Sequence, residues 1–361
     1  MFQLLANNGN SEGLFRAAMG DSPSLSFTPP SDGDYIQSVY NDMVSNSGCD
    51  NADDAAALKC LRSVSVATLA RAGKKVLTDR PATRYVFAPQ LDGKFITTRP
   101  VEGFTEGKFA QVPVLFGYEN GSPTSIKHAM LKTLLRSSAN SDEGANWSND
   151  LKDPNANTSM PNATEVTVYN FLRGQYASFT RESFESALAL YPLEDYNGSF
   201  SLQGQQMYGE VRFICTASLI TAAAASKSPM KAFQYHYNND HLGSDHRAEL
   251  AAFWGKAGTA SDDDKTLFKG MREFYSSFVT SGQPQSSLAT WEATDLRGTR
   301  RLRLDPAGTR MEEMSAQARR YLSAPFVSSR STIIKKPTAA WNSALSIRGV
   351  DATEVKVTGK P

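Results

Sequence analysis

Residues 111–121 are QVPVLFGYENG, and this stretch decides the fold class. An almost uninterrupted apolar run, 111–118, ends at a carboxylate, Glu119. A short run of this kind is typical of a strand that is buried on both faces, as strands in parallel sheets are. A second such run, MKAFQYHYN, lies at 230–238. The sequence therefore predicts two buried strands with polar side chains directly after each of them.

Segments with helical periodicity surround the two runs. The spacing of apolar residues predicts helices over 31–45, 53–63, 65–76, 164–175, 181–190 and 264–282. The last is the most regular, with an inward face of Leu267, Met271, Tyr275 and Phe278. Helices interleaved with isolated apolar strands are typical of an α/β fold with a mostly parallel sheet and flanking helices.

Composition limits the domain organisation and the partners. The chain has 361 residues and a formal net charge of +1, which favours neither nucleic acid nor an anionic membrane as partner. It has no run of eighteen apolar residues, so no transmembrane segment is expected. The tail at 326–361 has no sustained periodicity. We therefore expect one domain over 1–325, followed by a poorly ordered extension.

Polar residues that follow the two strands are the candidates for a functional site. Glu119 and Asn120 follow the first strand, and the loop after the second leads to His246 in SDHRAELAAFWG, 244–255. The carboxyl ends of parallel strands are where an open α/β sheet places its site. A histidine beside a carboxylate can accept and return a proton.

No metal or other cofactor is expected at these positions. Three further histidines have no second ligand at the spacing that zinc requires: His128, His236 and His241. The segment HYNNDH, 236–241, is better explained as a solvated loop.

Several segments together resemble one enzyme family. They are FAPQLDGKFITTRPVEGFTEGKFAQVPVLFGYENG, HRAELAAFWG, EFYSSFVTSGQPQ followed by Trp291, TRMEEMS and GCDNADDAAALKCLRSV. In this combination the chain is similar, from Met1 to about Ser323, to the type-B carboxylesterase/lipase family of cholinesterase-like α/β-hydrolases, and within it to fungal secreted lipases and esterases. The resemblance implies an α/β-hydrolase fold, of which this chain would be the C-terminal two-thirds only.

The resemblance also implies roles for individual residues. Such enzymes cleave carboxylic esters through an acyl-serine, with a histidine that an acid orients. His246 matches the catalytic histidine, and Glu249 would be a supporting hydrogen-bonding group. The family's acid directly precedes a glycine, and here that residue is Asn120, an amide that cannot stabilise an imidazolium by charge. Glu119 can take over if the loop is shifted by one residue; otherwise it is a solvated loop glutamate.

The nucleophile is the least regular part of the resemblance. The segment MFQLLANNGNSEGLFRAAM corresponds to the region just after the family's nucleophile, so the serine turn and the oxyanion loop are expected before residue 1. Gly9–Gly13, GNSEG, matches the G-x-S-x-G pattern, but only eight residues precede it and no strand leads into it. Ser11 is therefore expected in a plain turn.

Two hypotheses on function follow. The first is a carboxylic-ester hydrolase by descent, inactive as the printed chain and acting on a lipid or small-molecule ester only if a nucleophile is supplied. The alternative is a non-catalytic cholinesterase-like binding protein, which the irregular ENG segment favours.

Cysteines and sequons point to secretion. The resemblance implies a disulfide between Cys49 and Cys60; without it the two would be free thiols. Cys215 lies in an apolar run and is expected to be a buried, inert thiol. Sequons in polar surroundings predict N-glycosylation at Asn146, Asn157, Asn162 and Asn197. Secretion is therefore expected, although no signal peptide is visible in the sequence.

Overall fold

One sheet organises the molecule. The computed structural model describes residues 1–50, 53–80, 86–119, 155, 162–177, 179–227, 231–244, 246–255 and 259–314. Within these ranges the sheet has the strand order β1 (Ala18–Asp21), β2 (Val114–Glu119), β3 (Ala232–Tyr237), β4 (Arg300–Leu304), β5 (Arg310–Glu313). Strands β1 to β4 pair in parallel, and β5 is antiparallel to β4. The expected α/β fold with a mostly parallel sheet is confirmed.

The two strands predicted from apolar runs form the centre of this sheet. All six residues of β2 and all six of β3 are buried. Val114, Phe116 and Tyr118 face one side of the sheet, and Leu115 belongs to the core on the other side. This alternation follows from the two-residue repeat of a strand. A strand covered on both faces is mostly apolar along its whole length, which is why these two were visible in the sequence although Gln234 and His236 are buried in β3.

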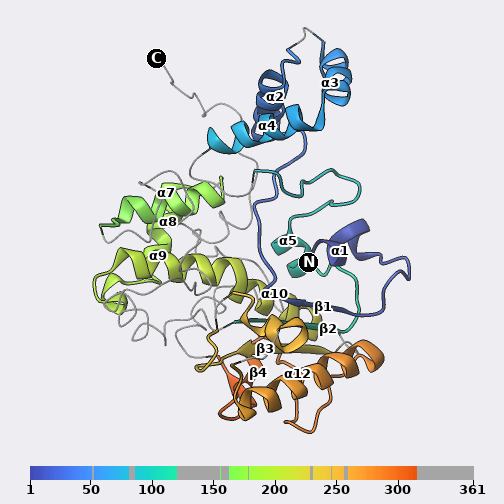
Figure 1. Ribbon diagram of the computed structural model, residues 1–361, viewed down its shortest axis with the longest axis vertical. Coiled ribbons are helices and arrows are strands. Elements are labelled where there is room, and N and C mark those ends of the chain that lie inside the picture. The colour runs from blue at the N-terminus through green and yellow to red at the C-terminus, as the bar shows by residue number, and fades with distance from the viewer. Residues whose placement is uncertain are drawn as a thin grey trace, which may run out of the picture.

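Helices cover both faces of the sheet, as Figure 1 shows for α10 and α12. α10 (Cys215–Ala225) packs on one face through Ala217, Ile220 and Ala224. α12 (Asp262–Ser281) packs on the other, and its expected inward residues are buried there. This helix ends at Gly282, whose left-handed backbone (φ 75°) favours glycine.

The remaining helices in these ranges are α1 (Phe2–Leu5), η1 (Ala6–Gly9), α5 (Pro100–Glu106), α7 (Glu165–Gln175), α8 (Arg181–Leu188), η4 (Leu193–Tyr196), α9 (Phe200–Gly209), η5 (Glu210–Ile214), η6 (Ala248–Leu250), α11 (Ala251–Trp254) and the three described next.

Three helices form an arm that lies away from the sheet (Figure 1). They are α2 (Asp34–Asn46), α3 (Asp54–Ser63) and α4 (Val66–Thr78). The expected disulfide joins Cys49 to Cys60, with 5.6 Å between the Cα atoms. Only small apolar clusters fill this arm. The disulfide stabilises the arm because it closes a short loop and so restricts the unfolded chain.

Two details predicted for the arm are wrong. Spacing of Ser31 and Asp34 predicts a capping box, but the N-cap of α2 is Gly33, without a side-chain cap. Apolar spacing also predicts that Val66 faces inward, whereas its exposed fraction is 83%. α4 instead buries Ala72 and Val76, and Val76 packs with Val39 of α2. The face of α4 that meets α2 thus excludes Val66, at the start of the helix.

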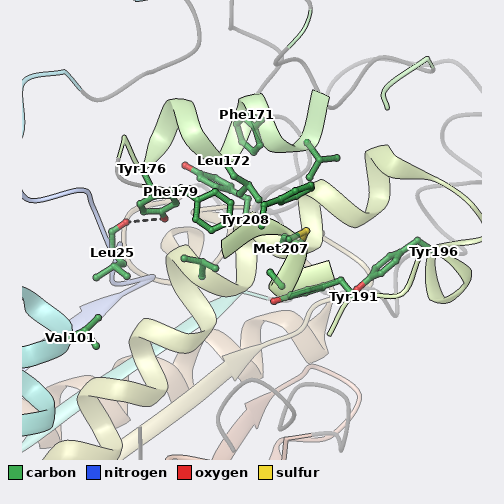
Figure 2. Packing of buried hydrophobic residues seen from close by; sticks show 14 residues of the cluster. Leu25, Val101, Phe171, Leu172, Tyr176, Phe179, Tyr191, Tyr196, Met207 and Tyr208 are labelled. Atoms are coloured by element: carbon green, nitrogen blue, oxygen red, sulfur yellow. Dashed lines mark hydrogen bonds between the residues drawn. The ribbon is translucent and has the colours of Figure 1, made fainter. Parts of the chain in front are cut away.

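Aromatic side chains fill the space between α7, α8 and α9 (Figure 2). Phe171, Tyr176 and Tyr208 lie at the centre, and the Tyr176 hydroxyl donates to the Leu25 carbonyl at 3.3 Å. Leu25 follows β1, so this bond attaches the helices to the end of the sheet. The sequence did not predict α9 or α10. In α10 small and apolar residues surround the helix, and in α9 glutamines interrupt the apolar residues, so neither shows an amphipathic period.

A buried acid sits where α9 continues into the π-turn η5. Glu210 is 4% exposed, and its carboxylate accepts hydrogen bonds from the Tyr191 hydroxyl, at 2.8 Å, and from the Gln206 amide. Burial raises the pKa of Glu210 from 4.5 to about 8, although both hydrogen bonds oppose the rise. The folded chain therefore holds a proton here that the unfolded chain has lost at neutral pH.

We expect the stability of the protein to fall as the pH rises from about 4.5 to about 8, because the folded state binds the Glu210 proton throughout this window and the unfolded state does not. The slope from this one group is at most about 1.4 kcal/mol per pH unit. Glu210→Gln removes the slope, which thermal unfolding at pH 5, 6.5 and 8 will measure. The exposed residue Glu194 provides the control, Glu194→Gln. Equal pH dependence in all three proteins would contradict the assignment.

Candidate active site

Three segments meet at the carboxyl end of the parallel strands. Glu119 is the last residue of β2 and is 1% exposed. The hydroxyl of Ser22, which directly follows β1, donates to Glu119 Oε2. The backbone N–H of Arg247, in the loop after β3, donates to Glu119 Oε1 at 3.1 Å. A single buried carboxylate thus fastens the end of β1 and the loop carrying His246 to the end of β2.

His246 lies next to this carboxylate and is half-buried. Its ring lies 5.7 Å from the ring of Phe213, centroid to centroid, at an interplanar angle of 33°. Burial lowers the pKa of His246 below 6.5; the negative charge of Glu119 opposes this, and the positive charges of Arg247 and Arg212 add to it. The imidazole is therefore mainly neutral at neutral pH, which is the form that accepts a proton.

Glu249 supports Glu119 as a proton donor. It lies in η6 and is 1% exposed. Burial, together with the hydrogen bond and the charge of Glu119, raises the pKa of Glu249 to about 11. Two carboxyl groups in contact cannot both be ionised in a buried site, so one keeps its proton and shares it with the other. Glu249 is the neutral member, which leaves the charge on Glu119.

A third carboxyl group, Asp21, completes the cluster at the end of β1. Its Oδ1 accepts hydrogen bonds from the hydroxyls of Tyr235, at 2.7 Å, and Tyr275, at 2.8 Å. Burial raises the pKa of Asp21, the two tyrosines lower it, and the charge of Glu119 raises it. Gly117 allows this arrangement, because a Cβ there would lie 2.3 Å from the Tyr235 ring. Of the charges in this cluster, that of Glu119 acts on the pKa of His246.

The residues proposed from the sequence are found as follows. Glu119, Glu249 and the loop of His246 come together, whereas Asn120 lies outside the described residues. Ser11 lies in the loop between η1 and β1, on the amino side of the sheet. His246 follows β3, at the carboxyl ends of the parallel strands, whereas Ser11 precedes β1.

Sequence reasoning missed Ser22, Asp21 and Phe213. A hydroxyl directly after a strand was the available signal for Ser22, but β1 itself was not predicted. Phe213 lies in an apolar run in which nothing marks one aromatic residue as different from its neighbours.

The other expectations concern metals, membranes and glycans. Within the described ranges, no group of three or more His, Cys, Asp or Glu side chains could hold a metal ion. No helix of these ranges is long and apolar enough to cross a bilayer.

Cys215 is a free thiol whose pKa is raised by burial. Asn162 and Asn197 are exposed in turns, while His128, Asn146 and Asn157 lie outside the described part.

Comparisons with known proteins agree on one family. A family model, the carboxylesterase family, matches residues 1–321. Lipase 4 of Diutina rugosa is 38% identical over 130 residues, which are 34% of this chain and 23% of that protein. A secreted triacylglycerol lipase of Gibberella zeae is 23% identical over 301 residues, or 77% of this chain and 45% of that protein.

Among solved structures, EstA of Aspergillus niger superposes with a TM-score of 0.68 at 19% identity, covering 96% of this chain and 62% of that one. This likeness and the sheet described above confirm the expected α/β-hydrolase fold. The chain spans less than half the length of both curated relatives and less than two thirds of the solved esterase.

We expect the two charged neighbours of His246 to act in opposite directions on its pKa. Glu119→Gln removes a negative charge and should lower the pKa of His246 by about half a pH unit or more. Arg247→Ala removes a positive charge and should raise it. NMR titration of the four histidine rings measures both changes in one experiment. Shifts of the same sign, or none in Glu119→Gln, would mean that Glu119 does not act on the ring.

Proposed function

The chain belongs to the carboxylesterase family, and on that premise we propose that Glu119 and His246 are the acid and the proton acceptor of an ester-hydrolysing site. The observation that carries the proposal is the buried Glu119 carboxylate. It accepts the N–H of Arg247, the residue after His246, and its charge acts on the ring. Ester hydrolysis needs a neutral imidazole with a fixed carboxylate beside it.

The proposed chemistry is acyl transfer through a serine. His246 removes the proton of the serine hydroxyl as the oxygen attacks the ester carbonyl, and then gives it to the leaving alcohol. Water cleaves the acyl-serine in the same way. Glu119 keeps the imidazole oriented and stabilises its positive charge, while protonated Glu249 and the Ser22 hydroxyl keep Glu119 fixed and ionised. Asn120 has no role in this proposal.

Ser11 is not the proposed nucleophile, because it precedes β1 whereas His246 follows β3. A β-strand rises about 3.3 Å per residue, so the four residues of β1 alone separate its two ends by more than hydrogen-bond reach. We therefore propose that the 361 residues alone hydrolyse esters at a negligible rate, and that the site needs a serine and oxyanion donors from another segment.

The substrate and the location follow from the relatives. A triacylglycerol lipase among them supports a lipid or other carboxylic ester as substrate. That lipase is secreted, and the disulfide together with exposed sequons at Asn162 and Asn197 supports a secreted glycoprotein here too. We also propose glycans at Asn146 and Asn157, one domain over 1–325 with an extension over 326–361, and no nucleic-acid partner.

A non-catalytic binding protein is the second candidate. The observation that favours it is the amide of Asn120 directly before Gly121, where the family has its acid. If Glu119 serves only to fasten the loop, the site keeps its structure and has no chemical role. The two candidates differ in whether His246 affects turnover once a nucleophile is present.

We expect the printed chain to show no serine-dependent hydrolysis of a short-chain nitrophenyl ester. The assay compares the chain with Ser11→Ala and with a blank containing imidazole at the same histidine concentration. Turnover above the blank that disappears in Ser11→Ala would overturn the assignment of Ser11 to a plain turn.

A chimera tests the proposed roles directly. The part of Aspergillus niger EstA outside the superposed region is joined to this chain, on the proposal that this part carries the missing serine and oxyanion donors. We expect restored hydrolysis, reduced by about 10⁴-fold in His246→Ala and by a similar factor in Glu119→Gln. The control is His236→Gln, a histidine outside the site. A folded, active chimera that is insensitive to His246→Ala would favour the binding protein.

A further inference from the structure

The loop between β3 and His246 is folded around one asparagine. Asn239, which is 1% exposed, accepts hydrogen bonds at Oδ1 from the backbone N–H groups of His241, at 3.0 Å, and Leu242, at 2.8 Å. Its own backbone N–H donates to Ser244 Oγ at 2.6 Å. These bonds are local, so they give the loop a shape but do not attach it to the rest of the molecule.

Asn238, at the start of the loop, is bonded to Leu304 and Asp305. Asp264, in the first turn of α12, attaches the part of the loop that follows. Its carboxylate is 0% exposed and accepts four hydrogen bonds. Two come from the N-cap residue Ser261, through its N–H and hydroxyl, both at 2.8 Å. The other two come from the loop: Asn239 Nδ2 at 2.7 Å, and His241 Nδ1 at 2.6 Å.

This carboxylate does more than close a helix cap. In a capping box, the acid at the third helical position returns to the N-cap residue and satisfies the helix start. Asp264 does so and in addition holds the loop, with one oxygen for Asn239 and the other for His241 and Ser261. Burial would raise the pKa of Asp264, but the bonds from Asn239, Ser261 and His241 lower it to about 2. It stays charged, as an acceptor of four donors must.

The position of His246 depends on how the part of the loop that precedes it is held. On its other side, the Arg247 N–H is bound to Glu119, and Glu249 is buried. Arg247 adopts a left-handed backbone (φ 75°) although it is not glycine, and Gly243 has φ 91°. A non-glycine residue keeps such a conformation only where the surrounding structure holds it. A loop fixed at one end alone would let Arg247 relax and would carry the imidazole away from Glu119.

We propose that Asn239, His241 and Asp264, the loop clamp, are positioning residues for His246. The clamp fastens the loop to the start of α12, which in turn packs on the sheet through Leu267 and Met271. The imidazole is thereby held between two fixed points, the clamp and Glu119. This inference rests on the proposed role of His246. The attachment of the loop by the clamp can nevertheless be measured without an assay of ester hydrolysis.

Two single substitutions separate the clamp from the helix cap. His241→Ala removes one bond on the loop side and leaves the Ser261–Asp264 capping box intact; the side chain is 54% exposed, so the fold tolerates the loss. Ser261→Ala is the matched control, because it weakens the cap and leaves both loop bonds to Asp264. His241→Gln keeps an amide donor and should rescue the first variant.

The readouts are the pKa of His246, from ring NMR, and hydrogen exchange at the Arg247 N–H. In His241→Ala we expect the pKa to rise by several tenths of a unit toward 6.5, because burial is what lowers it, and exchange to speed up about tenfold or more. His241→Gln should return both toward the wild-type values. Ser261→Ala should lower the melting temperature and leave both readouts unchanged.

The proposal is overturned if His241→Ala leaves the pKa and the exchange rate as in the wild type, since Asp264 would then serve the helix alone. It is also overturned if Ser261→Ala changes both readouts as much as His241→Ala does. An inactive chimera would refute the proposed function without changing either result, so the two failures are distinguishable.

Discussion

The burial of one ionised carboxylate is the constraint on which the rest of this structure depends. Glu119 is 1% exposed, and a buried charge is tolerated only where hydrogen bonds replace the water it has lost. Its partners are Ser22 and Arg247, which lie 97 and 128 residues away along the chain. The end of β1 and the loop after β3 must therefore reach the end of β2 before the charge is satisfied. The same bonds that make the burial possible bring the candidate site together.

The distribution of protons follows from this constraint. Three carboxyl groups, Asp21, Glu119 and Glu249, lie within interaction distance of one another, and their pKa values are coupled. Glu249 keeps its proton because it is buried and bonded to Glu119. For Asp21, burial raises the pKa, and the two tyrosine hydroxyls that donate to it lower the pKa. The charge of Glu119 raises the pKa of His246 against the effect of burial. The proposed orientation of the imidazole by Glu119 therefore depends on how the cluster distributes its protons.

The elements that could be predicted from the sequence are those that pack against the core along their whole length. β2 and β3 are mostly apolar, and α12 has one continuous apolar face. The residues of each element therefore indicate which of its sides are buried. β4, RRLRL, was missed because its arginines are charged; Arg301 is nevertheless buried, since Glu312 pairs with it from β5 at 2.7 Å. β1 has only four residues and no apolar run. The choice between Glu119 and Asn120 could not be made from sequence, because it depends on where β2 ends.

Three histidines follow within eleven residues, and each lies near a carboxylate, so that proximity alone does not define a proton acceptor. His236 bonds to Glu312 at 2.8 Å, but it is 6% exposed and shares that acid with Arg301. His241 bonds to Asp264, an acid already committed to a helix cap and to Asn239. Of these three, His246 is half-buried, and the acid that acts on it, Glu119, accepts hydrogen bonds from the Ser22 hydroxyl and the Arg247 N–H. Partial exposure and an acid bonded to uncharged donors, rather than a short contact, distinguish the candidate catalytic histidine from the two that hold the fold together.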